Sequence, residues 1–130
     1  MKILVGYENS RAAEAALNVA LKHARAFGAE LFIVTSLDQS RELTREDIEA
    51  VEDKLEKLKI THKIDDIHCE THAIVSLLSS GEDLIEFSRD NDIDDIVIGV
   101  KKRSKVGKLV FGSNAQYVIL EADCNVVTVK

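Results

Sequence analysis

The feature of this 130-residue sequence that most restricts its fold is a regular alternation of apolar, β-branched runs with amphipathic helical patterns. The runs at residues 2–7 and 94–100 are continuously apolar, as expected for strands buried on both faces of a parallel sheet. Further strands are expected at 30–37, 125–130 and, with more polar residues and hence near a sheet edge, 65–74. The β-α-β-α-β-α-β-α-β order predicts one α/β domain, residues 1–130, in which a five-stranded parallel sheet carries helices on both faces.

The four helical patterns have recognisable ends and apolar stripes. The first runs from 10 to 27, with Asn9 or Ser10 as its N-cap and Gly28 as its stop. The second runs from 44 to about 59, and its outward charges form a solvated face. The third is expected to begin near Gly81, and the fourth at Ser113. The expected cap pairs are Ser80 with Asp83 and Ser113 with Gln116, and the expected inward residues are Ala13, Leu17, Ala20, Leu21, Ala24, Ile48, Val51, Leu55, Leu58, Leu84, Ile85, Phe87, Ala115, Val118, Ile119 and Ala122.

Composition and charge narrow the functional class. Apolar residues make up 45% and charged residues 31% of the chain, which is the balance of a globular protein. The apolar run at the N-terminus is only about five residues long, and no run approaches the roughly 20 residues that cross a bilayer. We therefore expect a cytoplasmic protein without a membrane segment. A net charge of −6 argues against wholesale binding of nucleic acid.

The segment 99–113, GVKKRSKVGKLVFGS, is a basic exception in this acidic chain. It follows the fourth expected strand, at the edge of the sheet where doubly wound folds bind ligands, and YENS after the first strand shares that edge. Glycines and the free N–H groups of a helix that begins at Ser113 suit a phosphate. The segment fits neither a Walker A loop nor G-x-G-x-x-G. A solvated basic turn and an anion or RNA surface are the alternatives.

These segments also resemble the universal stress protein family over the whole chain. ILVGYENS resembles the family opening ILVAVDGS, with Glu8 at the usual aspartate, and FGSNAQYVILEADCNVVTVK resembles the closing segment. Nucleotide-binding members carry G-x2-G-x9-G-[S/T] after the fourth strand. Gly99, Gly112 and Ser113 match this motif, whereas Lys102 stands at its second glycine. The resemblance implies a Rossmann-like fold of the adenine nucleotide alpha hydrolase type.

The same resemblance implies an ATP-type site. Backbone near Ser36 and Leu37 would border the base, and Glu8 would meet the ribose or a Mg²⁺ ion. Glycines and Ser113 would hold the phosphates, and basic side chains would add charge, Arg103 with bidentate geometry. The complete set of expected nucleotide-binding residues is Tyr7, Glu8, Ser36, Leu37, Gly99, Lys102, Arg103, Gly107, Lys108, Gly112, Ser113 and Asn114.

Two other kinds of site are set aside. His68, Cys69 and His72 are competent zinc ligands, but in a strand the two histidines would stand roughly 13 Å apart with the cysteine on the other side. Cys69 and Cys124 form no C-x-x-C motif, so buried thiols are expected. No nucleophile with a nearby base is recognisable, so we expect no catalytic residue and at most slow ATP hydrolysis.

The terminal strand suggests a homodimer. A strand at 125–130 on a sheet edge would expose unpaired backbone groups, and Tyr117 and Leu120 fall outside the stripe of the last helix. Pairing of two such edges is similar to the family's practice, whereas packing under a neighbouring loop is the alternative for this residue pair. We expect a stress-response regulatory or signalling protein that binds adenine nucleotide. The alternative is a dimeric member without nucleotide that acts as an interaction module for an unknown protein partner.

Overall fold

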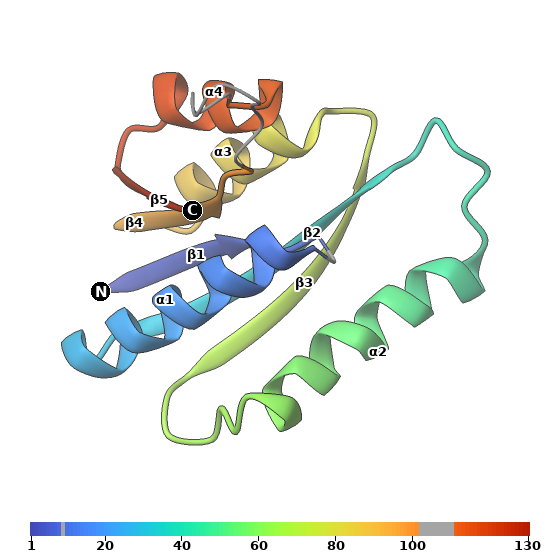
Figure 1. The fold of residues 1–130 in the computed structure, drawn as a ribbon. Coiled ribbons are helices and arrows are strands. Elements are labelled where there is room, and N and C mark those ends of the chain that lie inside the picture. Colours follow the sequence, from blue (N-terminus) through green and yellow to red (C-terminus); the bar gives the residue numbers. More distant parts are fainter. Residues whose placement is uncertain (9, 102–110) are drawn as a thin grey trace.

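The computed structural model describes residues 1–8, 10–101 and 111–130. They form a parallel sheet between two layers of helices (Figure 1). The elements are β1 (Lys2–Gly6), α1 (Arg11–Phe27), β2 (Glu30–Asp38), α2 (Arg45–Thr61), β3 (Cys69–Ser76), α3 (Ser80–Asp90), β4 (Asp95–Gly99), α4 (Ser113–Glu121) and β5 (Asn125–Val129). The strand order is β3-β2-β1-β4-β5, and all neighbouring pairs are parallel. The predicted fold class is confirmed.

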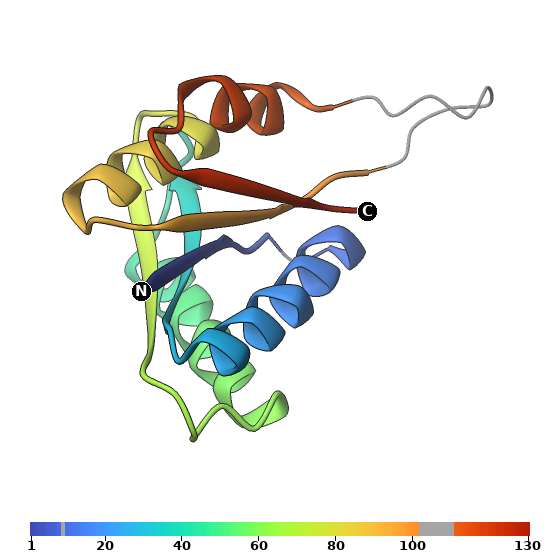
Figure 2. The same ribbon diagram turned by 90° about the vertical axis from the view of Figure 1, so that its left-hand side faces the viewer.

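Each face of the sheet is covered by a pair of helices (Figures 1 and 2). α1 and α2 pack on Ile3, Val5 and Ile33, whereas α3 and α4 pack on Leu4 and Phe32. Successive residues of a strand point to opposite faces, so a strand covered on both faces is apolar at every position. This arrangement explains why the runs of the inner strands are continuously apolar.

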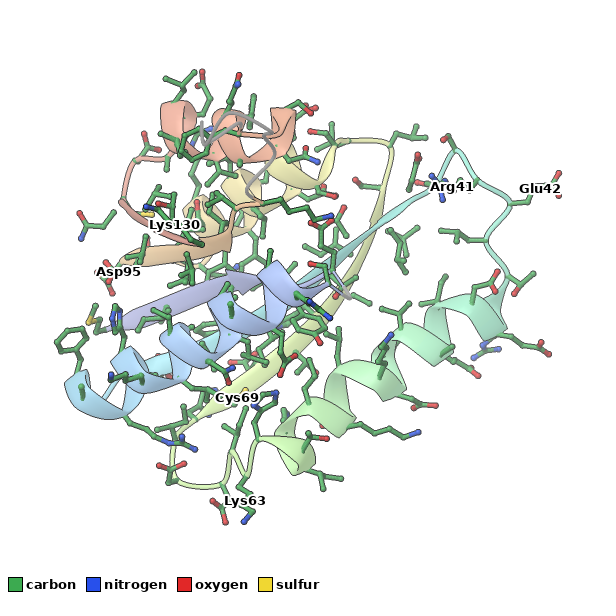
Figure 3. The ribbon with its side chains drawn as sticks, in the orientation of Figure 1. Arg41, Glu42, Lys63, Cys69, Asp95 and Lys130 are labelled. Carbon is green, nitrogen blue, oxygen red and sulfur yellow. The ribbon has the colours of Figure 1, made fainter. Side chains whose placement is uncertain are left out.

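β3 lies at an edge of the sheet, as its mixed composition predicts, but it begins later than expected. α2 continues to Thr61, and its closing turn includes Lys63 at φ 53. The Ile64 N–H then donates to the Lys59 carbonyl at 2.8 Å. Figure 3 shows Lys63 at this turn and Cys69 where the strand starts. Because residues 65–68 belong to the connection, pairing with β2 begins only at Cys69.

The ends of α1 are as expected, and Ser10 is the residue that caps it. The Ser10 hydroxyl accepts from the Ala13 N–H at 3.1 Å, and Gly28 ends the helix in the left-handed conformation, at φ 64. α2 also has a capping box, in which Thr44 and Asp47 bond to each other's backbone N–H groups. Both helices are therefore fixed at their starts by side chains close in the sequence.

The expected caps of α3 and α4 are wrong. α3 is capped by Ser79 with Glu82, one residue before the expected pair, because this S-x-x-E spacing allows each side chain to reach the other's N–H. The N-cap of α4 is Gly112, which has no side chain to donate or accept. Gln116 does not complete a capping box, since its amide nitrogen donates to the Phe111 carbonyl at 3.3 Å.

α4 is held by a narrower apolar face than its sequence predicts. Val118 is 1% exposed, and Ala115 and Ala122 are partly buried beside it. Ile119, which was expected to face inward, is 40% exposed. The stripe is therefore limited to small side chains around one valine. No helix in the described ranges combines the length and apolar character needed to cross a membrane.

Candidate functional site

A crevice of about 480 Å³ opens at the carboxyl ends of the strands. The C-terminus lies on this side of the sheet (Figure 2). The crevice lies beside β1 and β4, where the chain order of the sheet reverses, since β1 connects through α1 to β2 on its other side. Such switch points are where open α/β sheets bind ligands. The volume is within the ordinary range for small-molecule sites.

The lining of the crevice combines apolar walls with the exposed start of a helix. Val34, Leu84, Ile98 and Val118 supply apolar surface from β2, α3, β4 and α4. The first residues of α4 complete the lining, and the N–H groups of a first helical turn have no acceptor within the helix. A site of this kind can hold a ligand that is apolar at one part and anionic at another.

Seven of the twelve expected site residues line this crevice. They are Tyr7, Glu8, Ser36, Gly99, Gly112, Ser113 and Asn114. Leu37 does not line it, because the following position of β2 belongs to the opposite side of the sheet. Four further expected residues, Lys102, Arg103, Gly107 and Lys108, lie outside the described residues. Lys101, from the same basic segment, and Ser80 also line the crevice and were not among the expected residues.

The glycines at the site have different reasons for being glycine. A Cβ on Gly99 would stand 2.9 Å from the Ala12 Cβ and closer still to the Ala12 carbonyl, so Gly99 admits the first turn of α1. A Cβ on Gly112 would meet no atom of the described residues within 4 Å, and Gly112 has a φ of −66 that any residue can adopt. Packing within the protein explains Gly99, whereas it leaves the missing side chain of Gly112 unexplained.

Asn114 uses its side chain to join α4 to α3. Its Oδ1 accepts from the Gly81 N–H at 3.0 Å, and a Cβ on Gly81 would lie 3.1 Å from the Asn114 carbonyl oxygen. The side-chain oxygen of Asn114 is therefore engaged within the protein. Its backbone remains part of the first turn of α4, which borders the crevice.

Tyr7 lines the crevice, and its hydroxyl begins a series of contacts with Glu14 and His62 that the sequence did not predict. Its hydroxyl donates to Glu14 Oε2 at 2.9 Å, and Glu14 Oε1 lies 2.6 Å from His62 Nε2. His62 Nε2 and Glu14 Oε1 are close to each other, but they form no hydrogen bond. Burial, the hydrogen bond and the negative charge of Glu14 raise the pKa of Tyr7 to about 12. Tyr7 therefore stays neutral throughout the physiological range.

A buried aspartate lies directly behind the crevice. Asp83 is 3% exposed, and its carboxylate accepts from the hydroxyls of Ser36 and Ser76. The Ser76 contacts are 2.8 and 2.9 Å long, and the Ser76 hydroxyl oxygen also accepts from the Leu78 N–H at 3.0 Å. Sequence reasoning assigned Asp83 to a helix cap. The three side chains come from β2, β3 and α3, so only the fold brings them together.

The histidines of the segment set aside for zinc contact a carboxylate instead. His68 and His72 place their Nε2 atoms 2.8 and 3.3 Å from the two oxygens of Glu70. Hydrogen bonds from His68 and His72 lower the pKa of the Glu70 carboxyl. Burial raises the pKa of the Cys69 thiol to about 11. Across residues 1–8, 10–101 and 111–130 no group of three or more His, Cys, Asp and Glu side chains is arranged to hold a metal ion.

The sheet order and the crevice define a doubly wound α/β protein with a crevice at its switch point, where proteins of this class bind ligands. The model of the universal stress protein family matches residues 1–130. A universal stress protein of Thermus aquaticus is 30% identical, over 98% of this chain and 97% of its own. The chain belongs to the universal stress protein family.

Two solved structures from Archaeoglobus fulgidus are similar to this chain over its whole length. One universal stress protein is 34% identical, with a TM-score of 0.84 and 98% of its chain covered. A universal stress protein structure in complex with dAMP is 29% identical, with a TM-score of 0.81 and 98% of its chain covered.

Proposed function

We propose that this universal stress protein binds an adenine nucleotide of the ATP type in the crevice and acts as a cytoplasmic regulatory or signalling protein of the stress response. The observation that carries the proposal is Gly112, the N-cap of α4, where an added Cβ would meet none of the described residues within 4 Å. A phosphate in that space would receive backbone donors and the positive end of the helix dipole. The relative solved in complex with dAMP supports an adenine ligand.

The two ends of the nucleotide would meet different elements. The ladder between β1 and β2 ends at the Gly6–Val34 pair, whereas β2 stays paired with β3 as far as Asp38. The part of β2 beyond Val34 that faces the crevice, at Ser36, would border the base, with Tyr7 beside it. Glu8 would meet the ribose or a Mg²⁺ ion. Phosphates would lie against Gly112, Ser113 and the Asn114 backbone, with Gly99 nearby. The basic segment would complete the phosphate end of the site with Lys102, Arg103, Gly107 and Lys108.

Thermal unfolding of the nucleotide-stripped protein tests this function. ATP, ADP, AMP and GTP are added in turn, each with and without Mg²⁺. A ligand at a hundredfold its dissociation constant stabilises the native state by about 2.7 kcal/mol, which raises Tm by several degrees. We expect adenine nucleotides to give this shift in the wild type, and Gly112→Val to lose it because its side chain would occupy the phosphate space.

The Gly112 variants supply their own control. Because a Cβ at this position meets none of the residues that the structure describes within 4 Å, Gly112→Ala and Gly112→Val should unfold, without ligand, close to the temperature of the wild type. Gly112→Ala should retain part of the nucleotide shift. An unchanged shift in Gly112→Val would contradict the phosphate position, and the absence of a shift with any nucleotide in the wild type would contradict the function.

We further propose that two copies associate through α4 and β5. β5 is an edge strand, and the outer surface of α4 carries Tyr117, 38% exposed, and Leu120, 78% exposed, so the pair does not pack under a loop of the described residues. Antiparallel pairing of two β5 edges would satisfy their backbone groups and cover these side chains. The same surface would serve a protein partner if the function were that of an interaction module.

Light scattering at micromolar concentration tests the dimer. The wild type should have twice the chain mass of 14.4 kDa, and Leu120→Lys should have the single-chain mass. Ile60→Lys is the matched control, because Ile60 is similarly exposed but lies on α2, away from this surface. Wild-type protein of single-chain mass would contradict the dimer, and so would a monomer produced equally by both substitutions.

A further inference from the structure

Ser36 lines the crevice, and its hydroxyl donates its proton to a buried carboxylate, that of Asp83. The hydroxyl oxygen contacts Asp83 Oδ2, and Asp83 is buried behind it, between β2, β3 and α3. The Ser36 hydroxyl is the donor in this contact, and the carboxylate oxygen of Asp83 is the acceptor. The remaining lone pairs of the Ser36 oxygen can only accept a hydrogen bond from a ligand.

The environment of Asp83 keeps this polarity fixed. The second hydroxyl at the carboxylate, that of Ser76, has its oxygen occupied by the Leu78 N–H and therefore also directs its proton to Asp83. Asp83 lies in the first turns of α3, where the helix dipole favours a negative charge. No cationic side chain pairs with Asp83 among the residues that the structure describes. Both hydroxyls therefore act as donors to one buried acceptor.

We propose that Asp83 is a positioning residue that makes Ser36 an acceptor for the six-position amino group of a purine. This inference rests on the proposed nucleotide function and deepens it. A 6-aminopurine offers an N–H donor to the Ser36 oxygen, whereas a 6-oxopurine offers a carbonyl oxygen, which would leave two acceptors facing each other. The site would therefore select adenine over hypoxanthine and guanine. This selectivity would depend on Asp83, although Asp83 does not contact the ligand.

The test compares AMP with IMP, which carries an oxygen in place of the amino group, and with purine riboside monophosphate, which lacks either group. Dissociation constants are measured by calorimetry. The wild type should bind AMP at least about tenfold more tightly than IMP, with purine riboside monophosphate in between, because an unpaired buried polar group costs enough to produce such a factor. Ser36→Ala should reduce the AMP to IMP ratio to near one.

Asp83→Asn distinguishes positioning from packing. The asparagine has the same shape, but its amide can donate to the Ser36 oxygen and release the hydroxyl proton towards a six-position oxygen, so the ratio should fall to near one or reverse. Ser88→Ala is the matched control, since it removes another hydrogen-bonded α3 hydroxyl, the one donating to the Ile85 carbonyl, and should keep the wild-type ratio.

The outcomes separate the two proposals. Failure of the wild type to bind any of the three nucleotides would overturn both. Binding with equal affinity for AMP and IMP, or a ratio left unchanged by Asp83→Asn and by Ser36→Ala, would overturn the role of Asp83 while leaving the nucleotide function in place. A ratio lost equally in Ser88→Ala would also overturn it, because a general loosening of α3 would then explain the effect.

Discussion

Gly99→Ala should destabilise the protein by about 3 kcal/mol or more, towards the upper end of what overpacking costs. The added methyl group would meet the Ala12 carbonyl and stand 2.9 Å from the Ala12 Cβ. Ala12 lies in the first turn of α1, and the buried residues of α1 pack on the sheet. The backbones of α1 and β4 therefore cannot move apart without disturbing this packing. Urea-induced unfolding followed by circular dichroism measures the loss.

Gly112→Ala is the natural comparison, because both glycines match the family motif and line the same crevice. Because a Cβ on Gly112 contacts no residue in the described ranges, the free energy of unfolding of Gly112→Ala should remain within about 0.5 kcal/mol of the wild type. A Gly99→Ala protein as stable as the wild type would show that the contact with Ala12 is not tight. If Gly99→Ala loses the predicted stability, weaker nucleotide binding by Gly99 variants would be explained by their lower stability and would not be evidence of a phosphate contact.

Raising the pH from 10 to 12 should weaken the protein through Tyr7 alone by about 2 kcal/mol, because the pKa of Tyr7 is about 12 in the folded state and 10.0 when unperturbed. Below pH 10 the phenol is protonated in both states, and its contribution is fully present. Above pH 10 the unfolded chain loses this proton first, so unfolding becomes easier until the folded state also releases it.

Tyr7→Phe isolates this contribution from the other groups that titrate at high pH. The free energy of unfolding is measured in urea at several values between pH 9 and 12 for both proteins. The wild type should lose more stability than Tyr7→Phe across this interval, and the two pH curves should differ little in shape below pH 10. Parallel curves up to pH 12 would show that the Tyr7 phenol ionises as easily in the folded protein as in the unfolded chain.

The order and burial of the elements could be predicted because local patterns determine them. The continuous apolar run of β4 and the three-to-four-residue stripe of α1 depend only on which faces are covered. The predicted start of β3 and the predicted caps of α3 and α4 differ from the structure by a few residues. For the helices, the reason is that several adjacent serines and glycines can serve as a cap. Tertiary contacts decide between such neighbouring residues, and local patterns do not contain them.

The candidate site was predictable only in part. The loops after β1 and β4 follow from the position of the switch point, and seven of the twelve expected residues line the crevice there. The contacts of Asp83 with Ser36 and of Tyr7 with Glu14 join side chains that local spacing does not relate to one another. The role of Gly99 against Ala12 belongs to the same group, because the two residues are neighbours only after α1 has packed on β4.

The pairing of β1 with β4 joins residues that are more than ninety positions apart, such as Ile3 with Asp95. The first three strands can associate with α1 and α2 while the remainder of the chain is unstructured, but the crevice has only one of its two walls at that stage. Closing so long a loop is entropically costly and tends to come late. We therefore expect the two walls of the crevice to come together late in folding, after β1, β2 and β3 have associated.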